Sequence, residues 1–332
     1  MRRRVRSARV QVLDARRRGR ATSDLPPPTP LGSARCQNED GGPWTGAPLH
    51  LEPPLRTHRS PLARLAFAAS LVVAPGCGGG GGGGTVQPIL LPIQGDFDGD
   101  RLDTIGVYSP TSGNFFLKNS NSSGSADLTI PFGPVGGTSL PIVGDWDNDG
   151  VDTIGLYDPA SGNFFLKNTN SAGNPDLTFG FGAPNGGFVP LAGDWDGDGD
   201  DTIGLYEPAS GFFFLKDANT AGHADYVFTF GASGLDYQPI AGDWENDGLD
   251  SVGLYDPNTG NFFLRSNNPS APPPAPFTFG APGGNVRPVA GDWDGDGDDS
   301  IGLYNPSSGF FFLKNANTSG NADVTLIFTA GP

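Results

Sequence analysis

Residues 144–157 read GDWDNDGVDTIGLY, and close variants of this stretch occur four more times along the chain. The Gly-Asp-aromatic triplet that opens it recurs at a constant step of 49 residues, without insertion, at Gly95, Gly144, Gly193, Gly242 and Gly291. Self-similarity at a fixed period of a few tens of residues is the signature of solenoids, propellers and arrays. The five copies account for residues 86–332, so internal repetition decides the fold.

Each copy contains four short stretches with strand character, separated by turn residues. In the third copy these are residues 188–192, 202–206, 212–216 and 226–230. The run FFFL at 212–215 is apolar at consecutive positions, which is typical of a strand buried on both faces. Four antiparallel strands in a 49-residue unit, without a helix, have the dimensions of a propeller blade. The sequence therefore predicts an all-β fold, a five-bladed β-propeller of four-stranded repeats over residues 86–332.

Two alternatives concern this architecture. An open β-solenoid would also repeat, but its coils are usually shorter and its strands parallel. If the strands are counted from the Gly-Asp motif, every blade is contiguous in sequence and none combines both chain ends. The ring would then close through face packing alone, unless a terminal strand is exchanged between the first and last blades.

The charge is distributed unevenly along the chain. The 332 residues carry a net charge of −16, which combines +8 for residues 1–84 with −24 for residues 85–332. The acidic body excludes binding to phosphate backbones, which requires clustered Lys and Arg, so nucleic acid is not an expected partner. No apolar run approaches the length of a membrane-spanning helix. Both cysteines, Cys36 and Cys77, lie in the first part, which leaves the body without a disulfide or a thiolate metal site.

The segment before the repeats has the features of a processing signal. Residues 1–54 are rich in Arg and Pro and lack apolar periodicity, so we expect a disordered leader, interpreted as an over-extended gene model or a genuine basic leader. Residues 55–77 resemble a signal peptide whose end is similar to a bacterial lipobox, which implies lipidation at Cys77. Residues 78–85 would form a glycine tether. The expected location is the bacterial cell envelope, lipid-anchored at the outer membrane or cell surface, with secretion as the alternative.

A loop rich in carboxylates follows the Gly of every copy. Acids occupy loop positions 1, 3 and 5, and Gly usually follows at position 6, where it permits a tight turn. Three carboxylates inside one loop repel one another unless a hard cation neutralises them, and calcium is the expected ion. The predicted ligands are Asp96, Asp98, Asp100, Asp145, Asp147, Asp149, Asp194, Asp196, Asp198, Asp243, Glu245, Asp247, Asp292, Asp294 and Asp296. The alternative is a set of Asx-turns, in which Asp side chains accept hydrogen bonds from nearby backbone N–H groups without a metal.

The loop and the apolar strand after it resemble FG-GAP/VCBS-type repeats, including the calcium-binding blades of integrin α-subunit propellers. The resemblance covers all five units, and FGAP at 181–184 and 279–282 matches the family's Phe-Gly and Gly-x-Pro elements. It implies one more carboxylate ligand at position 9, where this chain has Thr or Ser with Asp at position 8 instead. The additional ligands implied are Asp103, Asp152, Asp201, Asp250 and Asp299. In the first copy Arg101 stands where Gly is expected at position 6.

Two further series recur in every copy. Loop position 2 is always a large ring, which could pack between blades or form the floor of a sugar site, and packing is favoured. These rings are Phe97, Trp146, Trp195, Trp244 and Trp293. A cation follows the third strand of each copy and is expected to pair with a neighbouring acid. These cations are Lys118, Lys167, Lys216, Arg265 and Lys314.

Five near-copies of one loop favour binding over catalysis, because catalysis usually requires one asymmetric site with groups of divergent pKa. His223 is the only histidine of residues 85–332, and copy-specific polar residues are scattered along the sequence. We therefore expect a non-enzymatic, calcium-stabilised propeller that binds or adheres to a surface protein or glycan. The alternatives are a lectin-like multivalent glycan binder and a propeller-type polysaccharide lyase or hydrolase. We expect a monomer that contacts membranes only through the lipid anchor.

Overall fold

The computed structural model describes residues 90–267 and 274–329. The predicted leader, the signal peptide with Cys77 and the glycine tether all precede residue 90 and lie outside the described residues. Within the described ranges every regular element is a strand, and no helix there is long and apolar enough to cross a membrane.

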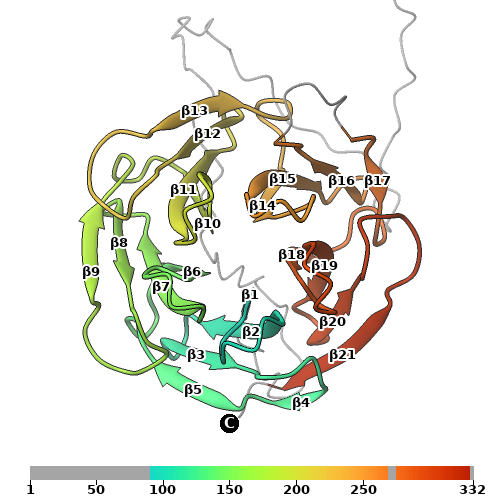
Figure 1. Cartoon of the computed structure of the whole chain (residues 1–332), viewed down its shortest axis with the longest axis horizontal. Helices are drawn as coiled ribbons and strands as arrows, with labels where there is room; N and C mark the ends of the chain where they lie inside the picture. The colour runs from blue at the N-terminus through green and yellow to red at the C-terminus, as the bar shows by residue number, and fades with distance from the viewer. Residues whose placement is uncertain (1–89, 268–273, 330–332) are drawn as a thin grey trace, which may run out of the picture. The chain divides into compact units, whose positions relative to one another are not determined.

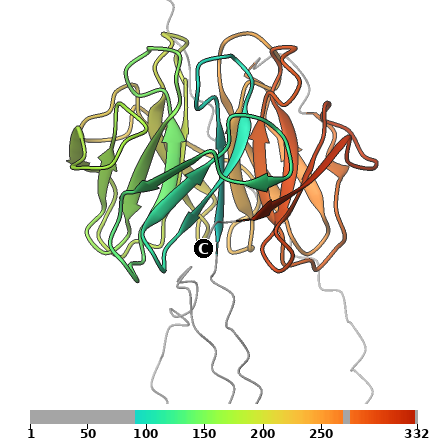
Figure 2. The ribbon, with the colours of Figure 1, turned by 90° about the horizontal axis from the view of Figure 1, so that it is seen from below.

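The described strands form five sheets that surround a central channel as blades (Figure 1). In each sheet four strands of one copy lie in chain order from the channel outwards, and the last sheet has a fifth strand from the first copy. Figure 2 shows the same ring turned by 90°, with the inner strands running along its axis. The structure confirms the five-bladed propeller and excludes the open solenoid.

The four strands of each blade occupy equivalent sequence positions. The inner strands are β1 (Leu91–Gly95), β6 (Leu140–Gly144), β10 (Val189–Gly193), β14 (Gln238–Gly242) and β18 (Arg287–Gly291). The second strands are β2 (Thr104–Ser109), β7 (Thr153–Asp158), β11 (Thr202–Glu207), β15 (Ser251–Asp256) and β19 (Ser300–Asn305). The third strands are β3 (Asn114–Leu117), β8 (Asn163–Leu166), β12 (Phe212–Leu215), β16 (Asn261–Leu264) and β20 (Phe310–Leu313). The outer strands are β5 (Leu128–Pro131), β9 (Leu177–Gly180), β13 (Tyr226–Thr229), β17 (Phe277–Thr278) and β21 (Val324–Thr329).

The inner strands carry a proline at their second position, which suits their place at the channel. Proline has no N–H to donate, so it is tolerated only where one side of the strand lacks a ladder partner. Pro92, for example, faces Val107 of β2 in the antiparallel register and lines the channel on its other side. The equivalent prolines are Pro141, Pro190, Pro239 and Pro288.

Apolar side chains fill every interface between neighbouring blades of the described chain. The second strands are buried on both faces, and all six residues of β2 are buried. Each second-strand Tyr packs on a third-strand Phe, with ring centroids 4.6 Å apart for Tyr108 and Phe115, a contact that contributes about 1 kcal/mol beyond area burial. Stacking of blades on both faces is thus the reason for the consecutive apolar residues in the sequence.

The ring closes through more than face packing, which decides a question that the sequence left open. The short strand β4 (Gly124–Ser125) of the first blade pairs in parallel with β21 of the last blade (Figure 1). The N–H of Ile327 also donates to Ser123 Oγ at 3.1 Å. No strand is exchanged; instead a loop of the first blade adds a fifth strand to the last sheet.

Candidate metal centres

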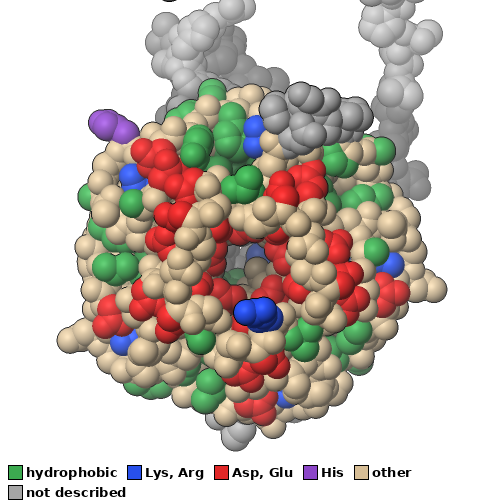
Figure 3. Space-filling model, in the orientation of Figure 1, with side chains coloured by type: hydrophobic (Ala, Val, Ile, Leu, Met, Phe, Trp, Pro, Cys, Tyr) green, Lys and Arg blue, Asp and Glu red, His purple; other side chains and the backbone are tan. Residues whose placement is uncertain are grey.

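The five carboxylate loops connect each inner strand to the second strand of the same blade, as residues 96–103 do between β1 and β2. All of them therefore lie at the same end of the ring. Figure 3 shows acidic side chains gathered around the opening of the channel at this end. The acidic loops, which recur every 49 residues in the sequence, therefore form one strongly negative rim.

The Asp at position 1 shapes each loop by accepting hydrogen bonds from its backbone. In the first loop Asp96 Oδ1 accepts from the N–H of Gly99 at 2.7 Å, and Asp96 Oδ2 accepts from the N–H of Arg101 at 2.6 Å. The second loop repeats this, with Asp145 Oδ2 bonded to the N–H of Gly150 at 2.7 Å. The predicted Asx-turns are therefore present, and they hold the loops in a curled form that turns further carboxylates inward.

Four of the described loops bring the carboxylates of positions 1, 3 and 5 together. One oxygen from each of the three acids lies within 4.8 Å of the others in the first, second, third and fifth loops. Calcium–oxygen bonds of about 2.3–2.6 Å allow a single ion to reach three oxygens at that spacing. All three donors are hard oxygens, so these clusters could hold a metal ion. They consist of Asp96, Asp98 and Asp100; Asp145, Asp147 and Asp149; Asp194, Asp196 and Asp198; and Asp292, Asp294 and Asp296.

The fourth and first loops depart from the common pattern. In the fourth, the acids Asp243, Glu245 and Asp247 do not converge in the same way, because Glu245 Oε2 accepts a hydrogen bond from the N–H of Asn267 at 3.1 Å. In the first, Arg101 has φ 70°, a left-handed conformation that costs a residue with a side chain about 1–2 kcal/mol. Arg101 thus adopts the backbone conformation of the glycines found at position 6 of the other loops. Because the backbone is the same, the first loop keeps its three-carboxylate cluster.

The proximity of the acids perturbs their ionisation. Desolvation, followed by the neighbouring carboxylates at positions 5 and 1, raises the pKa of Asp98 and of Asp294 above its ordinary value. A negative charge that is disfavoured by desolvation and by like charges is stabilised when a cation enters. The electrostatics of the loops thus agree with their geometry.

Sequence reasoning missed an acid at position 7 of the third and fifth loops. The hydrogen bond with the neighbouring carboxyl, followed by desolvation, raises the pKa of Asp200 and of Asp298 to about 6. A hydrogen bond to the same neighbour lowers the pKa of the partners Asp198 and Asp296, so the two carboxyl groups of each pair titrate together. The signal was present in the sequence, because only these two copies have Asp between the Gly of position 6 and the Asp of position 8.

The Asp at position 8 contacts the loop of the preceding blade. Asp152 Oδ2 accepts from the N–H of Asp96 at 2.7 Å, and the N–H of Asp152 donates to the Asp96 carbonyl at 2.8 Å. We call this two-bond contact the interblade latch. The same latch joins Asp145 to Asp201, Asp194 to Asp250, Asp243 to Asp299 and Asp292 to Asp103. The structure therefore places Asp103, Asp152, Asp201, Asp250 and Asp299 away from the three-carboxylate clusters of their own loops.

The latch explains why glycine precedes every carboxylate loop. A Cβ atom on Gly291 would lie 2.6 Å from Asp103 Oδ2, and one on Gly193 would lie 2.6 Å from Asp250 Oδ2. Only glycine leaves room for the carboxylate of the next blade. Burial raises the pKa of Asp103 and of Asp201 to about 7, although a backbone hydrogen bond to each acts in the opposite direction.

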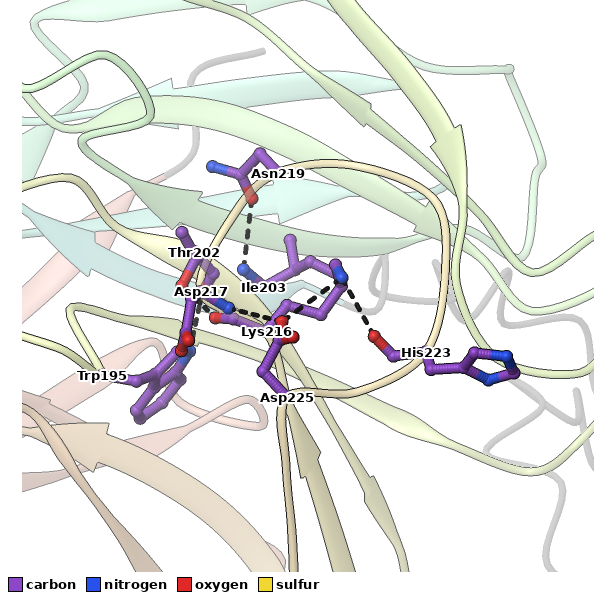
Figure 4. Close-up of polar contacts among 8 residues, drawn as sticks. All are labelled: Trp195, Thr202, Ile203, Lys216, Asp217, Asn219, His223 and Asp225. Carbon is purple, nitrogen blue, oxygen red and sulfur yellow. Dashed lines mark hydrogen bonds and ion pairs between the residues drawn. The ribbon is translucent and has the colours of Figure 1, made fainter.

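A third set of contacts anchors each loop to the outer part of its own blade. Asn219 Nδ2 donates to the carbonyl of Asp201 at 2.7 Å, and Asn219 Oδ1 accepts from the N–H of Ile203 at 3.2 Å. In the outer part of the blade the buried Lys216 donates to the carbonyl of His223 at 3.0 Å and pairs with Asp225 at 3.5 Å (Figure 4). Lys118, Lys167 and Lys314 form the equivalent ion pairs, which confirms the expected pairing for the lysines. The rings at position 2 pack between blades as predicted, and Trp195 is only 9% exposed.

No family model matches the sequence, and no curated protein matches it. Similar solved structures include BBS1N in complex with ARL6DN, at 10% identity over 72% of this chain and 70% of that chain, with a TM-score of 0.38. An Agrocybe aegerita lectin that recognises non-reducing terminal N-acetylglucosamine matches at 14% identity over 73% and 81%, with a TM-score of 0.38. The V. cholerae biofilm matrix protein Bap1 matches at 15% identity over 72% and 39%, with a TM-score of 0.30. At these values the similarities assign no site.

Proposed function

We propose that this protein is a non-enzymatic binding module whose propeller is stabilised by calcium, of the FG-GAP/VCBS type. The observation that carries the proposal is the convergence of three carboxylates within 4.8 Å in four of the described loops. A bound calcium ion would supply positive charge to each cluster, and the position 1, 3 and 5 side chains would hold it. The ions would then stabilise the loops that carry the interblade latches.

The distribution of reactive side chains supports binding rather than catalysis. His223, the one histidine among the residues that the structure describes, lies on an outer loop and contacts Lys216 only through its backbone carbonyl (Figure 4). The acid pairs with raised pKa values, at Asp200 and Asp298, lie in different blades and repeat each other. Catalysis usually requires one asymmetric site, whereas these two pairs occur in equivalent loops.

The proposal includes a location at the cell envelope and a partner on a surface. A lipid at Cys77 would tether the propeller to the cell envelope, and secretion is the alternative. The body would act as a monomer and would bind a surface protein or a glycan through loops on its rim. A lectin-like role is kept as the second candidate because one pocket between blades departs from the repeat.

Calorimetric titration of calcium into chelator-treated protein tests the proposal. We expect about four ions per chain, one for each converged cluster. The double variant Asp147→Ala/Asp149→Ala should lose one of them, because it removes two of the three carboxylates of the second loop. The matched control Asp236→Ala removes an exposed acid outside the loops and should leave the count unchanged. Absence of binding heat in the wild-type protein would refute the calcium-stabilised module.

A further inference from the structure

The fourth blade departs from the others directly after its third strand. In the other described blades a buried lysine at this position donates to a carbonyl of its own blade and pairs with an Asp nine residues later. In the fourth blade the cation is Arg265, and Pro274 occupies the position of that Asp. The Arg265 guanidinium lies over the ring of Phe228 in the third blade, 4.3 Å from the ring centroid. A contact within one blade has thus become a contact between two blades.

A pocket of about 230 Å³ lies beside this contact, between the third and fourth blades. The third blade contributes the aromatic side chains of Trp195, Tyr226 and Phe228 to its lining, and the fourth blade contributes Asp250, Arg265 and Asn267. Tyr226 is 40% exposed, so the pocket reaches the surface of the molecule. The third blade thus supplies aromatic rings to the pocket, and the fourth blade supplies the nitrogen donors of Arg265 and Asn267.

Two of these residues are specific to this interface. The positions equivalent to Tyr226 in the other copies hold aliphatic residues, namely Leu128, Leu177, Ala275 and Val324. The positions equivalent to Arg265 all hold lysine. The aromatic and guanidinium groups of the pocket are therefore additions to the repeat, and the fold does not need them in the other blades.

The size and charge of the pocket limit what it can hold. Its volume is below the ~300–1,000 Å³ of pockets for drug-sized ligands, so it suits a single small ring. The positive charge of Arg265 is opposed by acidic groups, since Asp250 lines the pocket and Asp217 lies beside the Tyr226 hydroxyl. Neither an anion nor a cation is therefore favoured. A pyranose combines an apolar C–H face for aromatic rings with hydroxyls for guanidinium and amide groups.

We propose that the pocket between the third and fourth blades binds one pyranose residue of a neutral saccharide. The sugar ring packs on the half-exposed Tyr226, and its hydroxyls accept hydrogen bonds from Arg265, which Phe228 holds in place from below. This inference rests on the proposed binding function and gives it a ligand class. It also replaces the expectation of several equivalent sugar sites with a single site per chain, so avidity would come from presenting many anchored chains.

The test is an array of neutral oligosaccharides with gluco-, galacto- and manno-configured ends, with uronate-ended oligosaccharides alongside, followed by calorimetry with the best neutral binder. We expect one site per chain. Tyr226→Leu and Arg265→Lys should each weaken binding at least about tenfold, because the first removes the aromatic ring and the second removes the guanidinium group. Both variants introduce residues that other blades carry, so the fold should be kept. The matched control Leu177→Ala, at the equivalent position of the second blade, should bind like wild type.

The outcomes separate this site from the general function. Absence of neutral saccharide binding, a preference for uronates, or binding that survives both variants would overturn the pocket as a pyranose site. Five sites per chain would overturn it as well, in favour of a repeated lectin site. Because the calcium titration is measured without saccharide, a positive result there would leave the calcium-stabilised module standing while this inference fails.

Discussion

Removal of calcium with a chelator is expected to lower the melting temperature of this protein by more than about ten degrees. A ligand present at a thousand times its Kd stabilises the native state by about 4 kcal/mol per site, and for a domain of this size each kcal/mol corresponds to roughly 2–4 °C. Four converged clusters offer four such sites. Without the ions, the net charge of −24 on residues 85–332 acts against the compact state. Differential scanning calorimetry with calcium and with chelator measures the difference.

Two variants make the measurement specific to the loops. Asp147→Ala/Asp149→Ala should lose a fraction of the calcium-dependent shift that corresponds to one site, while Asp236→Ala should keep the full shift. Magnesium at the same concentration should stabilise less, because it requires a stricter octahedral geometry and releases its water reluctantly. Identical melting temperatures with calcium and with chelator would mean that the Asx-turn hydrogen bonds alone shape the loops.

The variant Asp103→Ala is expected to destabilise the protein by about 2–3 kcal/mol. It removes the acceptor for the N–H of Asp292, and a partly buried donor without a partner costs roughly 1–3 kcal/mol. It removes the side-chain bond of the one latch that joins the first copy to the last and leaves the backbone bond to the Asp292 carbonyl, so the ring should begin to open there. Chemical denaturation should show a lower midpoint. Hydrogen exchange should show faster opening of β1 and β18 than in Asp201→Ala, which removes an internal latch.

A double-mutant cycle isolates the latch from other effects of the substitution. Gly291→Ala should be strongly destabilising alone, because its Cβ would lie 2.6 Å from Asp103 Oδ2. In the Asp103→Ala background the same change should cost at least about 1 kcal/mol less, since the clashing carboxylate is gone. Additive costs would show that Asp103 does not lie against Gly291, which would contradict the geometry of the latch.

The strands and blades could be predicted because their signals are local and repeated. The strands expected in the third copy agree with the structure to within one residue at each end. Ring closure could not be predicted in the same way. The partner of Asp103 is 189 residues away, and the Gly-Ser pair of β4 has no strand-forming side chains. Such contacts depend on which surfaces meet after the blades have formed, and no single copy encodes that choice.

In the candidate site, too, contacts within one loop could be predicted and contacts between distant parts of the chain could not. Positions 1, 3 and 5 were predicted because one short loop brings them together by its own curvature. Glu245 does not follow, because its longer side chain reaches the backbone of Asn267 in the outer part of the blade. The pocket could not be predicted because Tyr226 and Arg265 are 39 residues apart in sequence and belong to two blades, which only the assembled ring brings together.

Calcium in the converged carboxylate loops is the basis of the proposed function. X-ray diffraction from crystals grown with calcium, collected at a long wavelength, tests it by locating the ions through anomalous scattering. We predict peaks in the first, second, third and fifth loops, each about 2.3–2.6 Å from oxygens of the acids at positions 1, 3 and 5. Loops that keep their hydrogen bonds but show no anomalous peak at saturating calcium would contradict the claim.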